Sequence, residues 1–212
     1  MTESARRYGG RAAAERVAER RARLLAAGLE LMGTRGVAGA TVRGVAEESG
    51  LAARYFYESF PSIEALQLAV FEQIAAEAAA RSVAALATAP EGVEGVEERT
   101  RAVLAEMADL FLEDPRKGRI ALLESITSPV LGPRVLEESR RFAGMLAATA
   151  SSGDPAGSPE GLPVELLLRA RFLIGGVAHA LGAALQGDLD VERDRLVDVL
   201  VELFLTVDVV RP

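Results

Sequence analysis

The stretch TVRGVAEESGLAARYFYESF, residues 41–60, decides the fold of this 212-residue chain. Its apolar residues fall where two short helices joined by a tight turn would share a core; they are Val45, Leu51, Phe56 and Phe60. Gly50 lies between the two halves, where a positive φ is easiest without a Cβ. This pattern predicts a helix-turn-helix, whose second helix lies in the major groove of DNA.

Four of the ten aromatic residues of the chain lie in the second half of this stretch. Phe56 and Phe60 are four residues apart, so they share a buried face. Tyr55 and Tyr57 flank Phe56 and are therefore expected to point largely to solvent. Their hydroxyls can reach DNA phosphates, and Arg54 can reach a phosphate or a guanine edge. A helical hairpin whose tyrosines cover apolar neighbours accounts for the same residues.

Working outward, helical spacing, caps and breaks predict an all-α chain of about nine helices with no sheet. Thr41 caps a helix at residues 42–49, and a short helix follows at 53–59. The other expected helices cover residues 12–34, 63–86, 96–112, a segment that starts at Pro115 behind an Asp114 cap, 133–150, 163–186, and a last one that Asp190 caps and that ends near 209. Residues 151–161 (SSGDPAGSPEG) form a low-complexity linker.

Composition excludes several classes of protein. The chain has no cysteine, so disulfides, thiolate metal sites and thiol catalysis are absent, and its one histidine cannot build a metal site. It contains no HExxH, phosphate-binding glycine loop or GxSxG motif, so we expect no enzyme, no cofactor and no metal. No apolar segment follows the first arginines, and the longest apolar run, 172–185, is shorter than a membrane span. We therefore expect a cytoplasmic protein with no membrane contact.

Charge is divided unevenly along the chain. Residues 1–60 carry ten arginines against seven acidic residues, whereas the rest carries 14 basic and 24 acidic residues. A basic head on an acidic body favours a polyanion as the partner of the head. A margin of three charges also suits an ordinary surface.

Residues 17–75 resemble the N-terminal domain of the tetracycline-repressor (TetR) family of transcriptional regulators. The resemblance depends on a leucine- and alanine-rich first helix that ends at Gly36, and on Thr41, Val45-Ala46, Gly50-Leu51, Phe56-Tyr57, Phe60 and Glu64-Ala65-Leu66. It implies a basic leader at 1–16, a DNA-binding domain at 17–75 and a helical ligand-binding and dimerisation domain at 76–212. The implied function is a ligand-responsive repressor that binds a palindromic operator as a homodimer. The alternative is a helical small-molecule-binding or scaffold protein that has lost DNA binding.

The resemblance also implies a set of residues at the DNA surface, with Tyr57 on a phosphate: Thr41, Val42, Arg43, Ala52, Ala53, Arg54, Tyr55, Tyr57, Ser59 and Ser62. Three positions depart from the family pattern. Ala52 replaces a common serine or threonine, Ile63 a common lysine, and Ser59 a common histidine. Losing phosphate partners predicts weaker non-specific binding with a flatter salt dependence. The arginines of the first segment can compensate as a groove-reaching arm or along the first helix, or they form a solvated leader: Arg6, Arg7, Arg11, Arg16, Arg20, Arg21 and Arg23.

A small, largely apolar effector is expected among the later helices. Its candidate contacts are large or polar residues within apolar stretches, each of which also suits ordinary packing: Phe71, Met107, Phe111, Leu122, Glu124, Phe142, Met145, Phe172 and His179. His179 suits an interface or core position better than a ligand contact. Small and apolar residues at helical spacing predict a dimer surface, although packing within the chain explains them too: Gly176, Ala180, Ala184, Leu196, Leu200, Leu203 and Val207.

Overall fold

The structure is a computed structural model that describes residues 3–89 and 95–207, with side chains from residue 14 onward within those ranges. These residues form helices and no strand, as predicted. When the continuous run 115–127 is counted as one, the described part of the chain has nine helices. The chain divides into two compact units, Met1–Glu72 and Gln73–Pro212, whereas the sequence suggested a boundary after residue 75.

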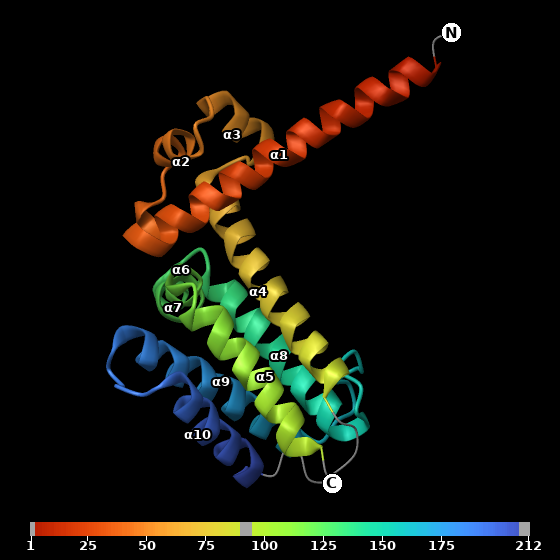
Figure 1. Cartoon of the computed structure of the whole chain (residues 1–212), viewed down its shortest axis with the longest axis vertical. Coiled ribbons are helices and arrows are strands. Elements are labelled where there is room, and N and C mark those ends of the chain that lie inside the picture. The colour runs from red at the N-terminus through yellow and green to blue at the C-terminus, as the bar shows by residue number, and fades with distance from the viewer. Residues whose placement is uncertain (1–2, 90–94, 208–212) are drawn as a thin grey trace. The chain divides into compact units, whose positions relative to one another are not determined.

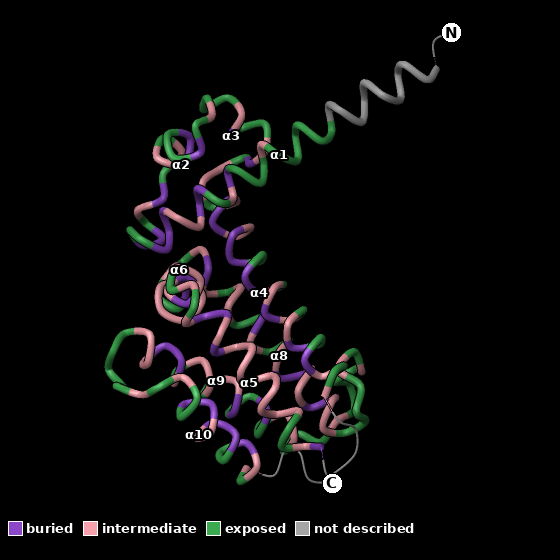
Figure 2. The backbone as a smooth tube through the Cα atoms, viewed as in Figure 1, coloured by how far each residue is buried: buried purple, intermediate pink, exposed green. Residues whose placement is uncertain are grey.

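The first unit contains α1 (Glu3–Arg35), a short 3-10 helix (Val37–Gly39), α2 (Val42–Ser49), α3 (Ala53–Ser59) and the start of α4 (Ile63–Thr88) (Figure 1). Its core is made by residues that are almost fully buried: Leu24, Leu31, Met32, Val45, Phe56, Phe60 and Leu66. Gly28 lets α1 approach α4 closely, because a Cβ there would lie 2.7 Å from Cδ2 of Leu66. Figure 2 shows this buried stretch in purple along α1.

The expected bounds of α2 and α3 agree with the structure, but the expected start of α1 was wrong. The first helix begins at Glu3, not near residue 12, so residues 3–16 of the predicted leader are helical. Gly9 and Gly10 disfavour a helix, but the alanines, arginines and glutamates around them are strong helix formers, and α1 continues through both glycines. Leu51, expected in the shared core, is half-buried.

The second unit contains the rest of α4, α5 (Val96–Leu112), α6 (Pro115–Gly118), a π-helical turn (Arg119–Glu124), α7 (Ser125–Thr127), α8 (Gly132–Ser152), α9 (Val164–Gln186) and α10 (Arg193–Thr206). Within this unit the most extensive helix–helix contacts are those of α8 with α9 and of α5 with α10 (Figure 1). Gly118 permits close packing at the end of α6. A Cβ there would lie 2.6 Å from the carbonyl oxygen of Phe111 and 2.7 Å from Cδ2 of Leu185.

The caps of the second unit were predicted with mixed success. Asp114 caps α6, with Pro115 at the first helical position and the Arg116 amide donating to the Asp114 carboxylate at 3.2 Å. Asp190 does not cap the last helix: α10 begins two residues later than that cap requires, with Glu192 at the N-cap and no side-chain hydrogen bond there. The expected end near residue 209 lies outside the described residues.

Candidate nucleic-acid interface

The turn between α2 and α3 has the geometry that its sequence predicts. Oγ1 of Thr41 accepts a hydrogen bond from the Gly44 amide at 3.1 Å and so caps α2. Gly50 follows α2 with φ 65°, in the left-handed region that glycine tolerates best. The Leu51 amide then donates to the carbonyl of Ala46 at 3.0 Å. These bonds fix the angle at which α3 leaves α2.

The aromatic residues of α3 divide into buried and exposed sides. Phe56 is fully buried, and its ring centroid lies 5.8 Å from that of the buried Phe60. Tyr57 is 62% exposed, and Ala53 and Arg54 are exposed as well. Most of α3 is therefore coloured as exposed or half-buried in Figure 2. One side of α3 anchors the helix, and the other side is free to meet a ligand.

Tyr55 differs from the expectation that it points largely to solvent, because it is half-buried. Two guanidinium groups contact its ring. The Cζ atom of Arg54 lies 4.7 Å from the ring centroid, and that of Arg20 lies 4.8 Å from it. Nη2 of Arg54 also donates to the Tyr55 hydroxyl at 2.9 Å. This hydrogen bond raises the pKa of Arg54, whose side chain stays charged.

Arginines of α1 hold α2 and α3 in place. Nη2 of Arg23 donates to the carbonyl of Ser49 at 2.6 Å, at the end of α2. Nη1 of Arg21 donates to the carbonyl of Ser59 at 3.3 Å, at the end of α3. Both carbonyls belong to the last turn of a helix, where they have no partner within the helix. The guanidinium groups thus satisfy them and complement the helix dipoles.

Arg20 adds a third contact from α1, an ion pair of 3.6 Å with Glu58. Glu58 is an acidic residue on the exposed side of α3, so Arg20 offsets a charge that a polyanion would meet. Three of the seven arginines proposed as an arm or a helix surface therefore contact the helix-turn-helix itself. Arg16 is exposed, and the side chains of Arg6, Arg7 and Arg11 lie outside the described residues.

The remaining predicted DNA residues surround this surface. Thr41, Arg43 and Ala52 are exposed, whereas Val42 is half-buried. Nε of Arg43 donates to Oε1 of Glu47 at 2.7 Å, and this hydrogen bond raises the pKa of Arg43.

Two serines and one alanine occupy structural positions near the same surface. Ser62 is half-buried and accepts a hydrogen bond from the Ala65 amide at 3.3 Å, at the start of α4. Ser59 is half-buried at the end of α3. Ala52 occupies the N-cap of α3, and no side chain caps that helix. The start of α3 thus lacks the hydroxyl that the family pattern suggests.

The candidate effector contacts lie at several depths. Phe111 is buried, and four further residues are half-buried in the second unit: Met107, Leu122, Phe142 and Met145. Phe71 is buried, but it belongs to the first unit. Oε1 of Glu124 accepts hydrogen bonds from Arg119 at 3.1 Å, so a protein cation already pairs with this acid. Phe172 and His179 are exposed on α9.

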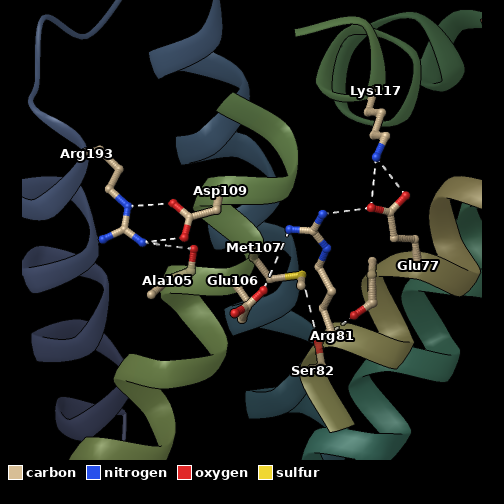
Figure 3. Close-up of polar contacts among 10 residues, drawn as sticks. Glu77, Arg81, Ser82, Ala105, Glu106, Met107, Asp109, Lys117 and Arg193 are labelled. Carbon is tan, nitrogen blue, oxygen red and sulfur yellow. Dashed lines mark hydrogen bonds and ion pairs between the residues drawn. The ribbon is translucent and has the colours of Figure 1, made fainter. Parts of the chain in front are cut away.

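An ion-pair network in the second unit was not predicted from the sequence (Figure 3). Nζ of Lys117 donates to both carboxylate oxygens of Glu77, at 2.8 and 2.7 Å, and Arg81 donates to the same carboxylate at 2.8 Å. Burial acts to raise the pKa of Glu77, but the bonds from Lys117 and Arg81 outweigh it and hold the pKa below its usual value. The network ties α6 to α4.

Arg193 makes a similar tie between α10 and α5. Its Nε and Nη2 atoms donate to the two carboxylate oxygens of Asp109, each at 2.7 Å (Figure 3). Elsewhere on the same helices, Arg101 of α5 pairs with Asp198 of α10. Partners so distant along the chain could not be matched from a single sequence. Within the described residues, no group of three or more His, Cys, Asp or Glu side chains could hold a metal ion.

The predicted dimer residues fall into two groups. Leu196 and Leu200 are buried inside the second unit, so packing within the chain accounts for them. Gly176 and Leu203 are exposed, and the other members are half-buried: Ala180, Ala184 and Val207.

A larger apolar stripe runs along α9. Val164, Leu168 and Phe172 recur every four residues and are 69–71% exposed. Gly176 and His179 continue the stripe, and a Cβ at Gly176 would meet nothing within 4 Å. Among the described residues, α9 is also the one helix whose length and composition would suit a membrane span, which alone is weak evidence for one. Val164, Leu168 and Phe172 were not predicted as an interface from the sequence, because the same spacing also suits a buried face.

Residues 24–70 match the family described as bacterial regulatory proteins, tetR family. No curated protein matches the chain. Its fold is similar to that of the fatty acid degradation regulator FadR from Bacillus halodurans, with a TM-score of 0.70 and 16% identity over 88% of this chain and 94% of that chain. FadR from Bacillus subtilis, in complex with stearoyl-CoA, has a TM-score of 0.68 and 18% identity over 87% and 97%. A tetR-family regulator from Streptomyces coelicolor has a TM-score of 0.70 and 19% identity over 89% and 80%. The TM-scores show that these proteins share a fold with this chain, and at identities of 16–19% the similarity shows the fold alone.

Proposed function

Since the chain belongs to the tetR family of bacterial regulatory proteins, we propose that it is a ligand-responsive repressor that binds a palindromic operator as a homodimer. The observation that carries this proposal is the surface of α3. Phe56 anchors the helix from behind, while Ala53, Arg54 and Tyr57 are exposed in front. A short, rigidly mounted helix with a cation and a hydroxyl on its free side suits the major groove.

In this proposal two copies place their α3 helices in successive major grooves, about 34–36 Å apart. The exposed row on α9 supports a second copy as the occupant of that surface. Rows of large apolar side chains rarely stay open to water in a monomer. Gly176 would allow another helix to approach closely, and Leu203 of α10 adds an exposed apolar side chain.

The proposed effector is a small, largely apolar molecule in the second unit. Half-buried Met107, Leu122 and Met145 supply adaptable apolar contacts there. The FadR regulator of Bacillus subtilis, which has a similar fold, is in complex with stearoyl-CoA, so a long-chain acyl-CoA is the first compound to test. The effector lowers operator affinity by the difference in its binding free energy to the two states of the protein. Occlusion of a promoter then suffices for repression, in the cytoplasm and without a catalytic step.

Selection of bound duplexes from a random library tests the DNA-binding part of the proposal. We expect an enriched palindrome with half-sites about one helical turn apart, and affinity that falls as salt rises. Addition of stearoyl-CoA to the complex tests the effector. Release of the duplex at micromolar ligand supports the acyl-CoA assignment, and unchanged binding excludes it.

The alternative, a helical binding or scaffold protein without DNA function, rests on two positions. Ala52 leaves α3 without a side-chain cap, and Ile63 stands where a lysine would meet a phosphate. The same selection decides between the two functions. If no duplex is enriched at low salt, the repressor proposal is wrong and the alternative stands.

A further inference from the structure

Arg54 is exposed, yet its guanidinium group makes two contacts with the neighbouring Tyr55. Its Nη2 atom donates to the Tyr55 hydroxyl at 2.9 Å, and its Cζ atom lies 4.7 Å from the centroid of the Tyr55 ring. An arginine on a helix surface ordinarily samples many rotamers, and fixing it costs entropy at the moment of binding. Here the stack and the hydrogen bond favour one position of the guanidinium before DNA binds, which lowers that cost.

Tyr55 is itself held by the rest of the first unit. The guanidinium of Arg20 lies 4.8 Å from the centroid of the same ring and reaches Glu58 at 3.6 Å. Two cations against one ring repel each other, and the carboxylate of Glu58 offsets that repulsion. The contact therefore joins α1 to the exposed side of α3 through Tyr55.

The arrangement leaves most of the Arg54 donors available. A guanidinium has five N–H groups in a plane, and the Tyr55 hydroxyl takes one of them. A pair of parallel donors remains, which matches two acceptors on one base edge. In the major groove guanine presents such a pair, N7 and O6. Adenine pairs an acceptor with a donor, thymine an acceptor with a methyl group, and cytosine presents a donor.

We propose that Tyr55 is a positioning residue that holds Arg54 as a specificity-determining residue, and that Arg54 reads guanine. This inference rests on the proposed DNA-binding function. Phosphate oxygens can also accept a bidentate guanidinium, so the choice of guanine depends on where Arg54 lies. Arg54 is the second residue of α3, and the N-terminal residues of the second helix of a helix-turn-helix contact base edges. The exposed side chain of Tyr57 remains available for a hydrogen bond to a DNA phosphate.

The test compares affinities for the selected operator and for duplexes in which each G·C pair is replaced in turn. Wild-type protein should lose about tenfold affinity or more when the guanine read by Arg54 is replaced. Arg54→Lys keeps the charge but lacks the fork, so it should abolish that discrimination and retain most non-specific affinity. Tyr55→Phe removes only the hydroxyl and should lower the discrimination by about threefold, with non-specific affinity unchanged.

Several outcomes overturn the inference. A guanine preference that survives Arg54→Lys makes Arg54 a phosphate contact. A Tyr55→Phe variant that loses affinity equally for all duplexes makes Tyr55 a backbone contact rather than a positioning residue. Melting temperatures show whether the variants fold. If Tyr55→Phe does not fold, Arg54→Lys by itself decides whether Arg54 reads guanine. If the wild-type protein enriches no duplex, the DNA-binding function fails and this inference fails with it.

Discussion

At the scale of single residues, Gly50 determines how α3 leaves α2. It has φ 65°, and a Cβ there would also lie 3.2 Å from Nη2 of Arg23, the atom that donates to Ser49. The side chain of Arg23 therefore lies close against the backbone of the turn. A change at this position disturbs both the turn and the contact with α1.

We expect Gly50→Ala to lower the free energy of unfolding by about 1 kcal/mol, the typical cost of a left-handed conformation for a residue with a Cβ. It should also weaken operator binding. Gly153→Ala is the matched control, because Gly153 follows α8 with φ 76° and has nothing within 4 Å of its Cβ position. Denaturant unfolding measures both variants. Equal stability losses accompanied by equal operator affinities would show that the Arg23 contact has no role.

Tyr57 gives a prediction about binding without a change in stability. Its side chain is 62% exposed, so Tyr57→Phe should leave the melting temperature unchanged. Loss of a hydrogen bond to a phosphate should lower affinity about tenfold for the selected operator and for unrelated duplexes alike. Fluorescence anisotropy titrations with both kinds of duplex check this. Unchanged affinity means that the hydroxyl does not contact DNA.

Local chemistry explains which residues could be foreseen. The Thr41 cap, the positive φ of Gly50 and the burial of Phe56 each depend on neighbours within a few residues, so the sequence predicts them. The half-burial of Tyr55 on α3 depends on Arg20, which is distant in sequence and contacts the ring from α1. No periodicity of α3 contains that information.

At the scale of helices, boundaries with strong caps or breakers were predictable, such as α6 at Asp114 and Pro115. The start of α1 was not, because Gly9 and Gly10 suggest a break in the sequence, whereas the helix continues through them to Glu3. The role of α9 was ambiguous for a different reason. A row of apolar residues at helical spacing suits a core and an interface equally well, and only the exposure of Phe172 in the structure distinguishes the two.

The tie between α4 and α6 predicts a pH dependence. The pKa of Glu77 is lowered in the folded protein, so its contacts stabilise the fold above the unfolded-state value of 4.5 and are lost as the pH falls below it. Glu77→Gln should cost about 1 kcal/mol at pH 7 and flatten the decline of stability below pH 4.5. Thermal unfolding from pH 3 to pH 7 measures this.

Glu202→Gln is the control for that experiment. Glu202 is an exposed glutamate of α10 whose ion pair with Arg195 spans 3.7 Å, and such pairs contribute little. The stability of the Glu202→Gln variant should follow that of the wild-type protein at every pH. If the stability of Glu77→Gln also follows that of the wild-type protein at every pH, the ion pairs of Glu77 do not contribute to stability.

At the scale of the whole molecule, the exposed row on α9 predicts the state of assembly. Phe172 is 69% exposed in the single chain, so Phe172→Glu should leave the protomer folded and convert a dimer to a monomer. Leu136→Glu is the control, since Leu136 is 59% exposed on α8 rather than on α9. Light scattering gives the molar mass. A monomeric wild type, or a dimeric Phe172→Glu variant, contradicts the assignment of this surface.

The arginine contacts from α1 limit how small a working fragment of this protein can be. A synthetic peptide of residues 41–60 would carry every predicted DNA residue except Ser62. It would lack the donors for the last carbonyls of both its helices and the cation that flanks Tyr55. Helices of eight and seven residues do not persist alone in water. The shortest fragment that keeps these contacts must therefore begin upstream of Arg20. A graft that omits that part of α1 transfers the sequence of the two helices without the contacts that hold them in place.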